Sequence, residues 1–224
     1  MARRVGWYPD ATTFTTPARL HLASVTRRFV DTILTVPADE AELTATAAEL
    51  ERMVAALDVH APALATQGRP PDRRHDDYLP RSPLVGELNV VSPPFEWEMV
   101  EGRLRAHGMF GPAHEGPPGY VHGGWVALAF DEALGITNVA SAKPGMTARL
   151  TIKYRHPTPL HVDLVLDCAV EKVEGRRVHT AGRLLDGDTV TAEAEGIFVN
   201  IGAQRALEYF GERPASPEPT DPLP

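Results

Sequence analysis

The clearest pattern of apolar and polar positions lies in the second half of the chain. Apolar residues at 148, 150, 152 and 154 alternate with polar ones, and a similar alternation runs from Val162 to Val170. A period of two is typical of strands that bury one face. Two further strands, Arg177 to Leu185 and Thr189 to Asn200, follow the tight-turn pairs Glu174-Gly175 and Asp186-Gly187. These turn signals favour hairpins, so the pattern predicts an antiparallel meander of four strands.

A second group of elements is predicted before this meander. Residues Leu84 to Val91 are apolar and β-prone, and Glu96 to Arg105 have the pattern of a strand. After a Gly/Pro-rich loop, a helix is predicted from about Gly123 to Thr137, and its sequence is apolar nearly all round. Such a helix is expected to be buried. The order of elements therefore predicts an α+β fold, in which five or six antiparallel strands form a curved sheet wrapped around one central helix.

The first 83 residues differ in composition and form a predicted N-terminal extension. From Asp39 to Asp58, apolar residues recur at helical spacing, and Asp39 followed by Glu42 matches a capping pair. We expect this helix to lie against the main domain or a partner chain. The remaining boundaries follow from changes in composition and pattern along the chain: a Pro-rich connector at 61–83, the main domain at 84–202 and a tail at 203–224. The tail is expected to be disordered from 213 onwards, because it has few apolar side chains to bury.

The composition places the chain among ordinary soluble proteins. Of its 224 residues, 43% are hydrophobic and 23% are charged. No stretch reaches the roughly 20 apolar residues that a membrane helix requires. A net charge of −8 argues against nucleic acid as the main partner. The start of the chain lacks the apolar run of a secretory signal, and the single cysteine, Cys168, excludes an internal disulfide. We therefore expect a cytoplasmic protein.

The segment from Tyr120 to Gly135 carries the residues that suggest chemistry. Gly123 and Gly124 stand where the loop enters the helix, and a helix N-terminus offers unpaired backbone N–H groups and a partial positive charge. Without side chains there, a carbonyl oxygen of a ligand can approach these donors closely, as in an oxyanion hole. The alternative is that the glycines only permit a tight turn. Asp131 changes this balance, because a carboxylate in an otherwise apolar helix is costly unless it is paired or used.

The spacing of these residues has a geometrical consequence. Gly123 and Asp131 are eight residues apart, which is about 12 Å along a helix axis. A carbonyl carbon and its attacking water need their partners within about 3 Å. If both residues act on one carbon, they must therefore come from different subunits. This agrees with the open face or edge that a single-layer sheet leaves. We expect a homodimer or a dimer of dimers, with a lone α+β domain as the alternative.

His122-Gly123-Gly124, followed by an acidic residue nine positions after the histidine inside an apolar helix, resembles the motif of the PaaI-type thioesterases of the hot-dog superfamily. The strand from Gly145 to Tyr154, with His156-Pro157 after it, is also similar to the strand that follows the helix in that family. The resemblance covers about Leu84 to Ile201. It implies a hot-dog fold and hydrolysis of acyl-CoA to free acid and CoA, without a metal or an organic cofactor.

The resemblance also implies roles for four catalytic candidates. The amide of Gly123 is expected to polarise the thioester carbonyl. Asp131, from the partner subunit, is expected to act as general base or nucleophile, and Thr147 to orient the water or the carboxylate. His122 precedes the helix and is expected to anchor the loop rather than to act as a base.

Three further residues are expected to contact the substrate: Gly124, Trp125 and Arg149. Arg149 suits the phosphates of CoA, because Arg can bind phosphate through two parallel hydrogen bonds. A solvated strand face is an equal alternative for this residue. The alternation in its strand also places Thr147 on the same face as Arg149, opposite the apolar face.

One feature departs from the family pattern. Many relatives have an amide side chain six positions before the histidine, where this chain has Gly116. His114 and Glu115 are the candidates to replace that second carbonyl donor. A metal site formed by His107, His114 and His122 is not expected, because their spacing matches no metal-binding pattern.

Two other functions remain open at the level of sequence. A hot-dog hydratase or dehydratase would also act on acyl thioesters, but such enzymes usually pair a catalytic histidine with a carboxylate, and the predicted helix contains no histidine. A non-catalytic acyl-CoA-binding protein, with the N-terminal helix as a partner-binding element, is the other alternative.

Overall fold

The structure is a computed structural model that describes residues 15–59 and 79–201. The elements, in chain order and with η for a 3₁₀ helix, are α1 (Pro17–Thr35), α2 (Glu40–Asp58), η3 (Leu79–Arg81), β1 (Glu96–Val100), β2 (Arg103–Gly108), η4 (Pro112–His114), α3 (Gly123–Ala140), β3 (Met146–Tyr154), β4 (Leu164–Glu174), β5 (Arg177–Asp186) and β6 (Thr189–Val199). Two compact units contain them. One holds α1 up to Leu34, the sheet and α3, and the other holds α2. The Pro-rich connector up to residue 78 and the predicted tail lie outside the described residues.

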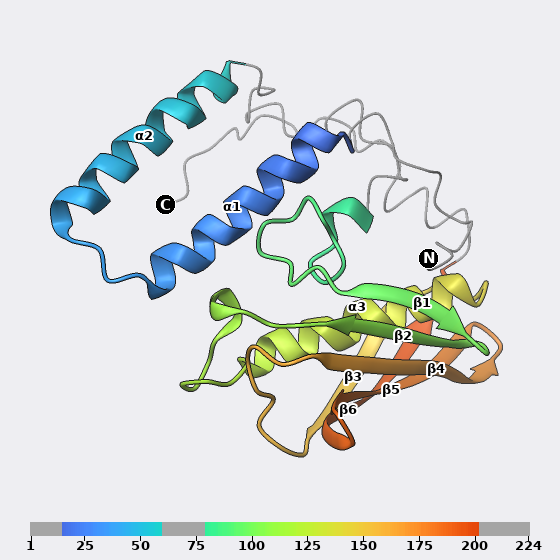
Figure 1. Cartoon of the computed structure of the whole chain (residues 1–224). Helices are drawn as coiled ribbons and strands as arrows, with labels where there is room; N and C mark the ends of the chain where they lie inside the picture. The colour runs from blue at the N-terminus through green and yellow to red at the C-terminus, as the bar shows by residue number, and fades with distance from the viewer. Residues whose placement is uncertain (1–14, 60–78, 202–224) are drawn as a thin grey trace, which may run out of the picture. The chain divides into compact units, whose positions relative to one another are not determined.

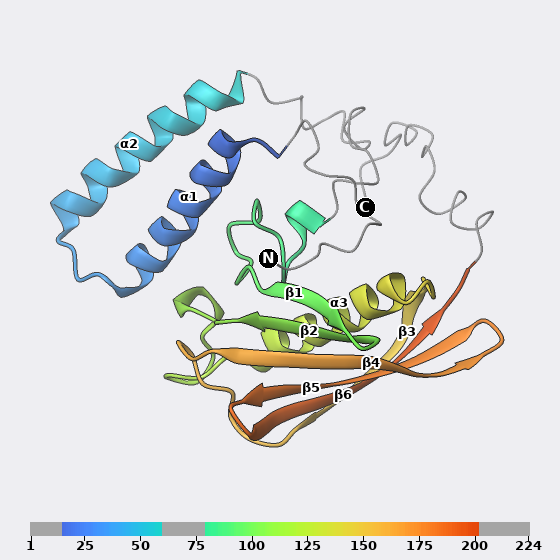
Figure 2. The same ribbon diagram turned by 45° about the vertical axis from the view of Figure 1, so that its right-hand side comes forward.

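The six strands form one antiparallel sheet in the order β1-β2-β4-β5-β6-β3. Helix α3 runs along one face of this sheet (Figure 1), and the turned view shows the strands curving past it (Figure 2). The core between helix and sheet is mainly apolar, and its large buried side chains include Phe130, Leu134, Leu104, Leu166, Leu184 and Phe198. The predicted curved sheet around one apolar helix is therefore confirmed. No helix among the described residues is long and apolar enough to cross a membrane.

The connections between strands differ from the prediction in two places. Strands β4, β5 and β6 do form a meander through the two predicted hairpins, with their turn residues one position later than predicted, at Gly175-Arg176 and Gly187-Asp188. Strand β3, however, pairs with β6 at the far edge of the sheet. The chain therefore crosses over between β3 and β4, which local alternation cannot reveal. The strand predicted from Glu96 to Arg105 is in fact a hairpin, because Glu101 and Gly102 both have positive φ (51° and 78°) and form a two-residue turn.

The prediction of a strand from Leu84 to Val91 is wrong, because this segment forms a series of turns. The Ser82 hydroxyl accepts hydrogen bonds from the N–H groups of Leu84 and Val85, which replaces the pairing that a strand would provide. Leu84 and Val85 are nevertheless buried in the core. The apolar pattern here indicated burial correctly and the backbone conformation wrongly.

The predicted helix from Asp39 to Asp58 is confirmed as α2, including its capping box. The Asp39 carboxylate accepts from the Glu42 N–H at 2.8 Å, and the Glu42 carboxylate accepts from the Asp39 N–H at 3.2 Å. None of the α2 residues is buried in the described structure, so the surface that its apolar stripe was expected to contact is not identified. Helix α1 was not predicted, although Thr16 caps it and Pro17 is its first residue.

Two glycines let α3 lie close to the sheet. A Cβ atom at Gly182 on β5 would stand 2.5 Å from the sulfur of Cys168 and 3.4 Å from Leu134. A Cβ at Gly196 on β6 would stand 2.5 Å from the ring of Phe198 and 3.1 Å from Leu134. The Leu134 side chain of α3 therefore packs where both strands lack side chains. Cys168 is buried there, as predicted, and burial raises the pKa of its thiol to about 12.

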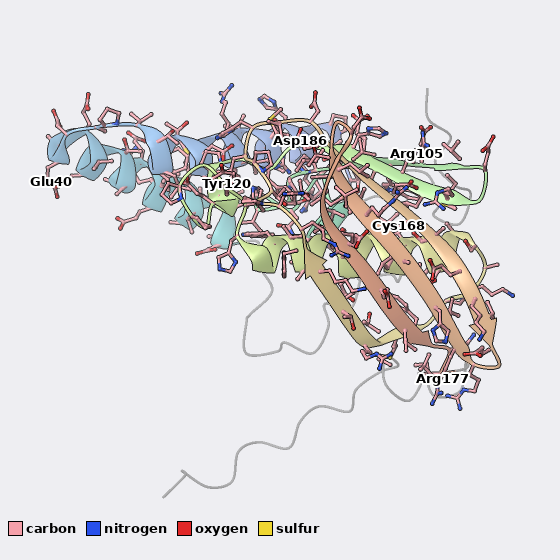
Figure 3. The ribbon with its side chains drawn as sticks, turned by 90° about the horizontal axis from the view of Figure 1, so that it is seen from below. Glu40, Arg105, Tyr120, Cys168, Arg177 and Asp186 are labelled. Atoms are coloured by element: carbon pink, nitrogen blue, oxygen red, sulfur yellow. The ribbon has the colours of Figure 1, made fainter. Side chains whose placement is uncertain are left out.

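The face of the sheet opposite α3 carries a row of alternating charges. One residue from each strand contributes, in the order Glu98, Arg105, Asp167, Arg183, Glu193 and Lys153. Figure 3 shows this part of the molecule with Arg105 labelled, and with Arg177 and Asp186 at opposite ends of β5. Opposite charges on neighbouring strands stabilise a sheet by about 0.2–1 kcal/mol per pair.

At the centre of this row, Asp167 is largely buried between arginines. Its carboxylate lies 2.8 Å from Arg103 Nε and 3.5 Å from Arg183 Nη2. Burial acts to raise the pKa of Asp167, but the hydrogen bond of Arg103 and the charges of Arg103, Arg105 and Arg183 together hold the pKa below its ordinary value. The carboxylate is therefore ionised and paired at neutral pH, and the outer face is a charged surface.

Helix α3 ends in a turn that requires a left-handed residue. The Lys143 N–H donates to the Asn138 carbonyl at 2.7 Å and the Ala142 N–H to the Val139 carbonyl at 3.0 Å, which is the bond pattern of a Schellman motif. Ala142 occupies the left-handed position with φ 57°. Glycine is the usual residue there, because a Cβ atom is unfavourable at this φ.

We predict that Ala142→Gly raises the free energy of unfolding by about 1 kcal/mol, since it removes this backbone strain. Urea denaturation measures the change. Ala127→Gly, inside the same helix, is the matched control and should lower stability by about 1 kcal/mol. A loss of stability in Ala142→Gly would contradict the assigned strain.

Candidate active site

The first turn of α3 leaves one backbone donor unused. The His122 carbonyl accepts from the Trp125 and Val126 N–H groups at 2.9 and 3.3 Å, and His122 Nδ1 accepts from the Gly124 N–H at 3.0 Å. Of the four N–H groups that a helix cannot pair internally, that of Gly123 remains. No acceptor is found for it among the described residues. His122 is thus the N-cap of α3, and the N–H of Gly124 is bonded to the side chain of that cap.

The carbonyl of Gly123 is held from the other side by β3. The Tyr154 hydroxyl donates to it at 2.9 Å. A Cβ atom at Gly123 would lie 3.5 Å from the Tyr154 ring, which is ordinary contact, so the ring also fixes the space beside this glycine. Sequence reasoning did not find Tyr154. Its position at the end of β3 was visible, but its contact with the helix depends on the tertiary fold.

Asp131 and Thr147 are brought together at the other end of β3. The Thr147 hydroxyl donates to Asp131 Oδ1 at 2.8 Å. Both residues are exposed in the single chain, whereas the apolar helix predicted a buried aspartate. The difference arises because β3 is an edge strand, so no further strand within residues 15–59 and 79–201 covers this side of α3. Asp131 Oδ2 has no hydrogen-bond partner among the described residues.

A β-bulge places Thr147 on the helix side of β3, which corrects the prediction from strict alternation. Thr147 is opposite Phe198 and Arg149 is opposite Ile197, so Ala148 is the extra residue. Phe198 is buried beneath α3. The bulge therefore turns Thr147 towards Asp131 while Arg149 faces away from it.

Arg149 is accordingly not part of the cluster formed by Asp131 and Thr147. Its neighbours on the outer side of the edge strand are in exposed ion pairs: Lys153 with Glu195 at 3.4 Å and Arg155 with Glu193 at 2.7 Å. Such pairs contribute little to stability. The arrangement favours the solvated-face interpretation of this strand side over a phosphate site.

Comparison with known proteins shows the family of this chain. The model of the thioesterase superfamily matches residues 118–193, which include α3 and β3. A crystallised thioesterase superfamily protein is 34% identical and superimposes with a TM-score of 0.73, covering 86% of this chain and 93% of that one. The chain belongs to the thioesterase superfamily. The hot-dog fold expected from the sequence agrees with this assignment.

This member of the thioesterase superfamily is also similar in sequence to proteins named acyl-coenzyme A thioesterases. Acyl-coenzyme A thioesterase THEM4 of Xenopus laevis is 39% identical over 141 residues, which is 60% of this chain and 62% of the relative. THEM4 of Mus musculus is 33% identical over 119 residues, 50% of this chain and 51% of the relative. The chain therefore spans between half and two thirds of the length of these relatives.

In this thioesterase superfamily member, His114 is buried and fully engaged. Only 5% of it is exposed. Its Nε2 lies 2.9 Å from the Val91 carbonyl, and its Nδ1 accepts from the Gly111 N–H at 3.0 Å. The ring meets Phe110 and Trp125 edge-on, with centroids 5.2 and 4.7 Å apart. His114 therefore supports the loop and is not available as a second carbonyl donor. Trp125 packs on it, so the expected substrate contact of Trp125 stays a prediction.

Glu115 and Gly116 do not supply the second donor either. The Glu115 carboxylate accepts from the Gly119 N–H at 2.7 Å. A Cβ atom at Gly116 would lie 2.7 Å from His122 Cα, so this position has no room for the amide side chain of the family pattern that the sequence resembles. Among the described residues, no cluster of three metal-binding side chains occurs.

We predict that Gly116→Ala lowers the free energy of unfolding by about 1–3 kcal/mol, because the new methyl group overlaps the backbone of the α3 cap. Thermal or urea unfolding measures this. Gly135→Ala is the control: its Cβ meets no atom within 4 Å, and the change should stabilise α3 by up to about 1 kcal/mol. Equal effects of the two substitutions would show that the close contact at Gly116 does not matter.

Proposed function

We propose that this chain hydrolyses acyl-CoA thioesters to a free acid and CoA, with Asp131 as the catalytic carboxylate. The observation that carries the proposal is the exposed Asp131 carboxylate, whose Oδ1 is fixed by Thr147 while Oδ2 is open. The names of the curated relatives, acyl-coenzyme A thioesterases, support the substrate class. The open Gly123 N–H supplies the group that such a reaction needs at the carbonyl oxygen.

The two groups are proposed to act across a dimer interface. They are eight residues apart on one straight helix, hence about 12 Å apart along its axis. The free edge of β3 and the exposed Met146 and Tyr154 beside it support a second copy at this edge. In this arrangement, the Asp131 of one subunit faces the Gly123 N–H of the other.

The reaction then follows from the geometry. Oδ2 of Asp131 takes a proton from water, whose oxygen attacks the thioester carbon, and the partner's Gly123 N–H stabilises the oxyanion that forms. The C–S bond breaks as the carbonyl re-forms, and the Asp131 carboxyl returns its proton to the CoA thiolate. Direct attack by Asp131, followed by hydrolysis of an acyl-aspartyl anhydride, is the other course open to the same carboxylate.

We expect Asp131→Asn to lower kcat by at least about 100-fold, because it removes the base but keeps the shape of the side chain. A thiol-release screen with short, long and aromatic acyl-CoAs measures this. Asp188→Asn, at an exposed turn, should leave activity unchanged. Undiminished hydrolysis in Asp131→Asn would reject the mechanism. CoA binding without thiol release would instead indicate a binding protein, and turnover of enoyl-CoA would indicate a hydratase.

The role of the Gly123 N–H is tested by Gly123→Pro, in which a carbon of the proline ring replaces the amide hydrogen. Proline is tolerated at the first helical position, and His122 already has the extended backbone that a following proline requires (φ −61°, ψ 134°). Loss of one oxyanion donor should lower kcat by roughly 100- to 1000-fold. Gly123→Ala retains the N–H and is the matched control, expected to lose far less.

Mixed dimers distinguish the cross-subunit site from a site within one chain. Asp131→Asn and Gly123→Pro subunits, co-expressed with different tags and purified as heterodimers, would together contain one intact site and one doubly defective site. About half of the wild-type activity per dimer is therefore expected. If both groups acted from the same chain, every site would carry one defect and activity would not return.

A further inference from the structure

Arg27 ties helix α1 to the loop before β1 by hydrogen bonds. Arg27 Nε donates to the Ser92 carbonyl at 3.0 Å, and its Nη2 donates to the carbonyls of Glu87 and Asn89 at 3.1 and 3.0 Å. Burial lowers the pKa of Arg27, and the nearby carboxylates of Asp31 and Glu87 oppose this effect. A guanidinium with a fixed fork of donors is well suited to hold three carbonyls in place.

The loop that Arg27 binds also contacts His114. Val91 lies between two of the residues whose carbonyls hold the guanidinium, and its own carbonyl is the partner of His114 Nε2 at 2.9 Å. Asp31, one helical turn after Arg27, also lies beside the same region: its carboxylate is 3.6 Å from where a Cβ of Gly111 would stand. Helix α1 therefore lies beside both segments whose backbone groups hold the His114 ring.

His114 in turn contacts the start of α3 by two independent routes. Its carbonyl accepts from the His122 N–H at 2.9 Å, which sets the cap residue. Its ring packs edge-on against Trp125, in the first turn of α3. The cap residue His122 lies between these two contacts and the Gly123 N–H. A series of direct contacts therefore leads from Arg27 to that N–H.

We propose that α1 is a positioning element of the active site, and that Arg27 acts through Val91 and His114 to set the direction of the Gly123 N–H. This inference rests on the proposed function, because it assigns a purpose to that donor. Arg27 binds carbonyls of the loop before β1 and none of the candidate catalytic residues, so it is a positioning residue. A misplaced donor impairs the chemical step more than substrate binding, since the donor acts mainly on the transition state.

The test compares Arg27→Met with Arg28→Met in the full-length chain. Methionine keeps an unbranched apolar stem but donates no hydrogen bonds, and Arg28 is the exposed neighbour on the same helix. For Arg27→Met we expect kcat to fall by roughly fivefold to tenfold with KM within about twofold, whereas Arg28→Met should match the wild type. Arg27→Lys, which restores a cationic donor, should recover part of kcat.

Amide hydrogen exchange of the peptide that spans residues 115–125 provides a readout that does not depend on catalysis. Faster exchange at the His122 and Gly124 amides in Arg27→Met, but not in Arg28→Met, is expected if the contacts transmit position. If the protein proves not to be a thioesterase, the exchange measurement still shows whether Arg27 affects the start of α3. If Arg27→Met does not fold, Arg27→Lys is measured in the same two ways, with a smaller effect of the same kind.

Three results would overturn the inference. The first is unchanged kcat and unchanged exchange at residues 115–125 in a folded Arg27 variant. The second is an equal effect of the Arg27 and Arg28 substitutions, and the third is a change in KM alone. Either of the last two would show that α1 supports the fold or the substrate without setting the donor.

Discussion

The contact of the edge strand β3 with α3 is the constraint on which the proposed site depends. Tyr154 holds the carbonyl of Gly123 at the start of the helix, and Thr147 holds the carboxylate of Asp131 two turns later. One strand thus holds a group of each candidate residue, the Gly123 carbonyl and the Asp131 carboxylate, by hydrogen bonds from side chains on its inner side. Because β3 is at the edge, these groups stay open to a second molecule instead of being covered by a further strand.

Close packing elsewhere makes this contact possible. Leu134 of α3 sits over Gly182 and Gly196, where any side chain would keep the helix away from the sheet. The bulge at Ala148 then shifts the alternation of β3 by one residue, so that Thr147 faces the helix. Without the bulge, the same sequence would direct the hydroxyl to the charged outer face and leave Asp131 without its partner.

The loop that carries His114 connects this site to the rest of the unit. Phe95, Phe110, His114 and Trp125 form a continuous row of ring contacts from the segment before β1 to the first turn of α3. Polar contacts of the buried His114 ring fix its orientation within that row. Rigid support of this kind is what a precisely aimed backbone donor requires. It also explains why an N-terminal helix, remote in sequence, lies against the same loop.

Local pattern by itself determined the helix with its glycine entry, the Asp131 candidate, four of the strands and the capped helix α2. The segment predicted as one strand also contains the pair Glu101-Gly102, which has the same residue types as the turn signal at Glu174-Gly175. Only the tertiary structure decided that β3 pairs with β6, that Thr147 faces Asp131 and that Asp131 is exposed. Periodicity records which side of a segment is buried, whereas strand partners, bulges and edges depend on contacts between residues that are distant in the chain.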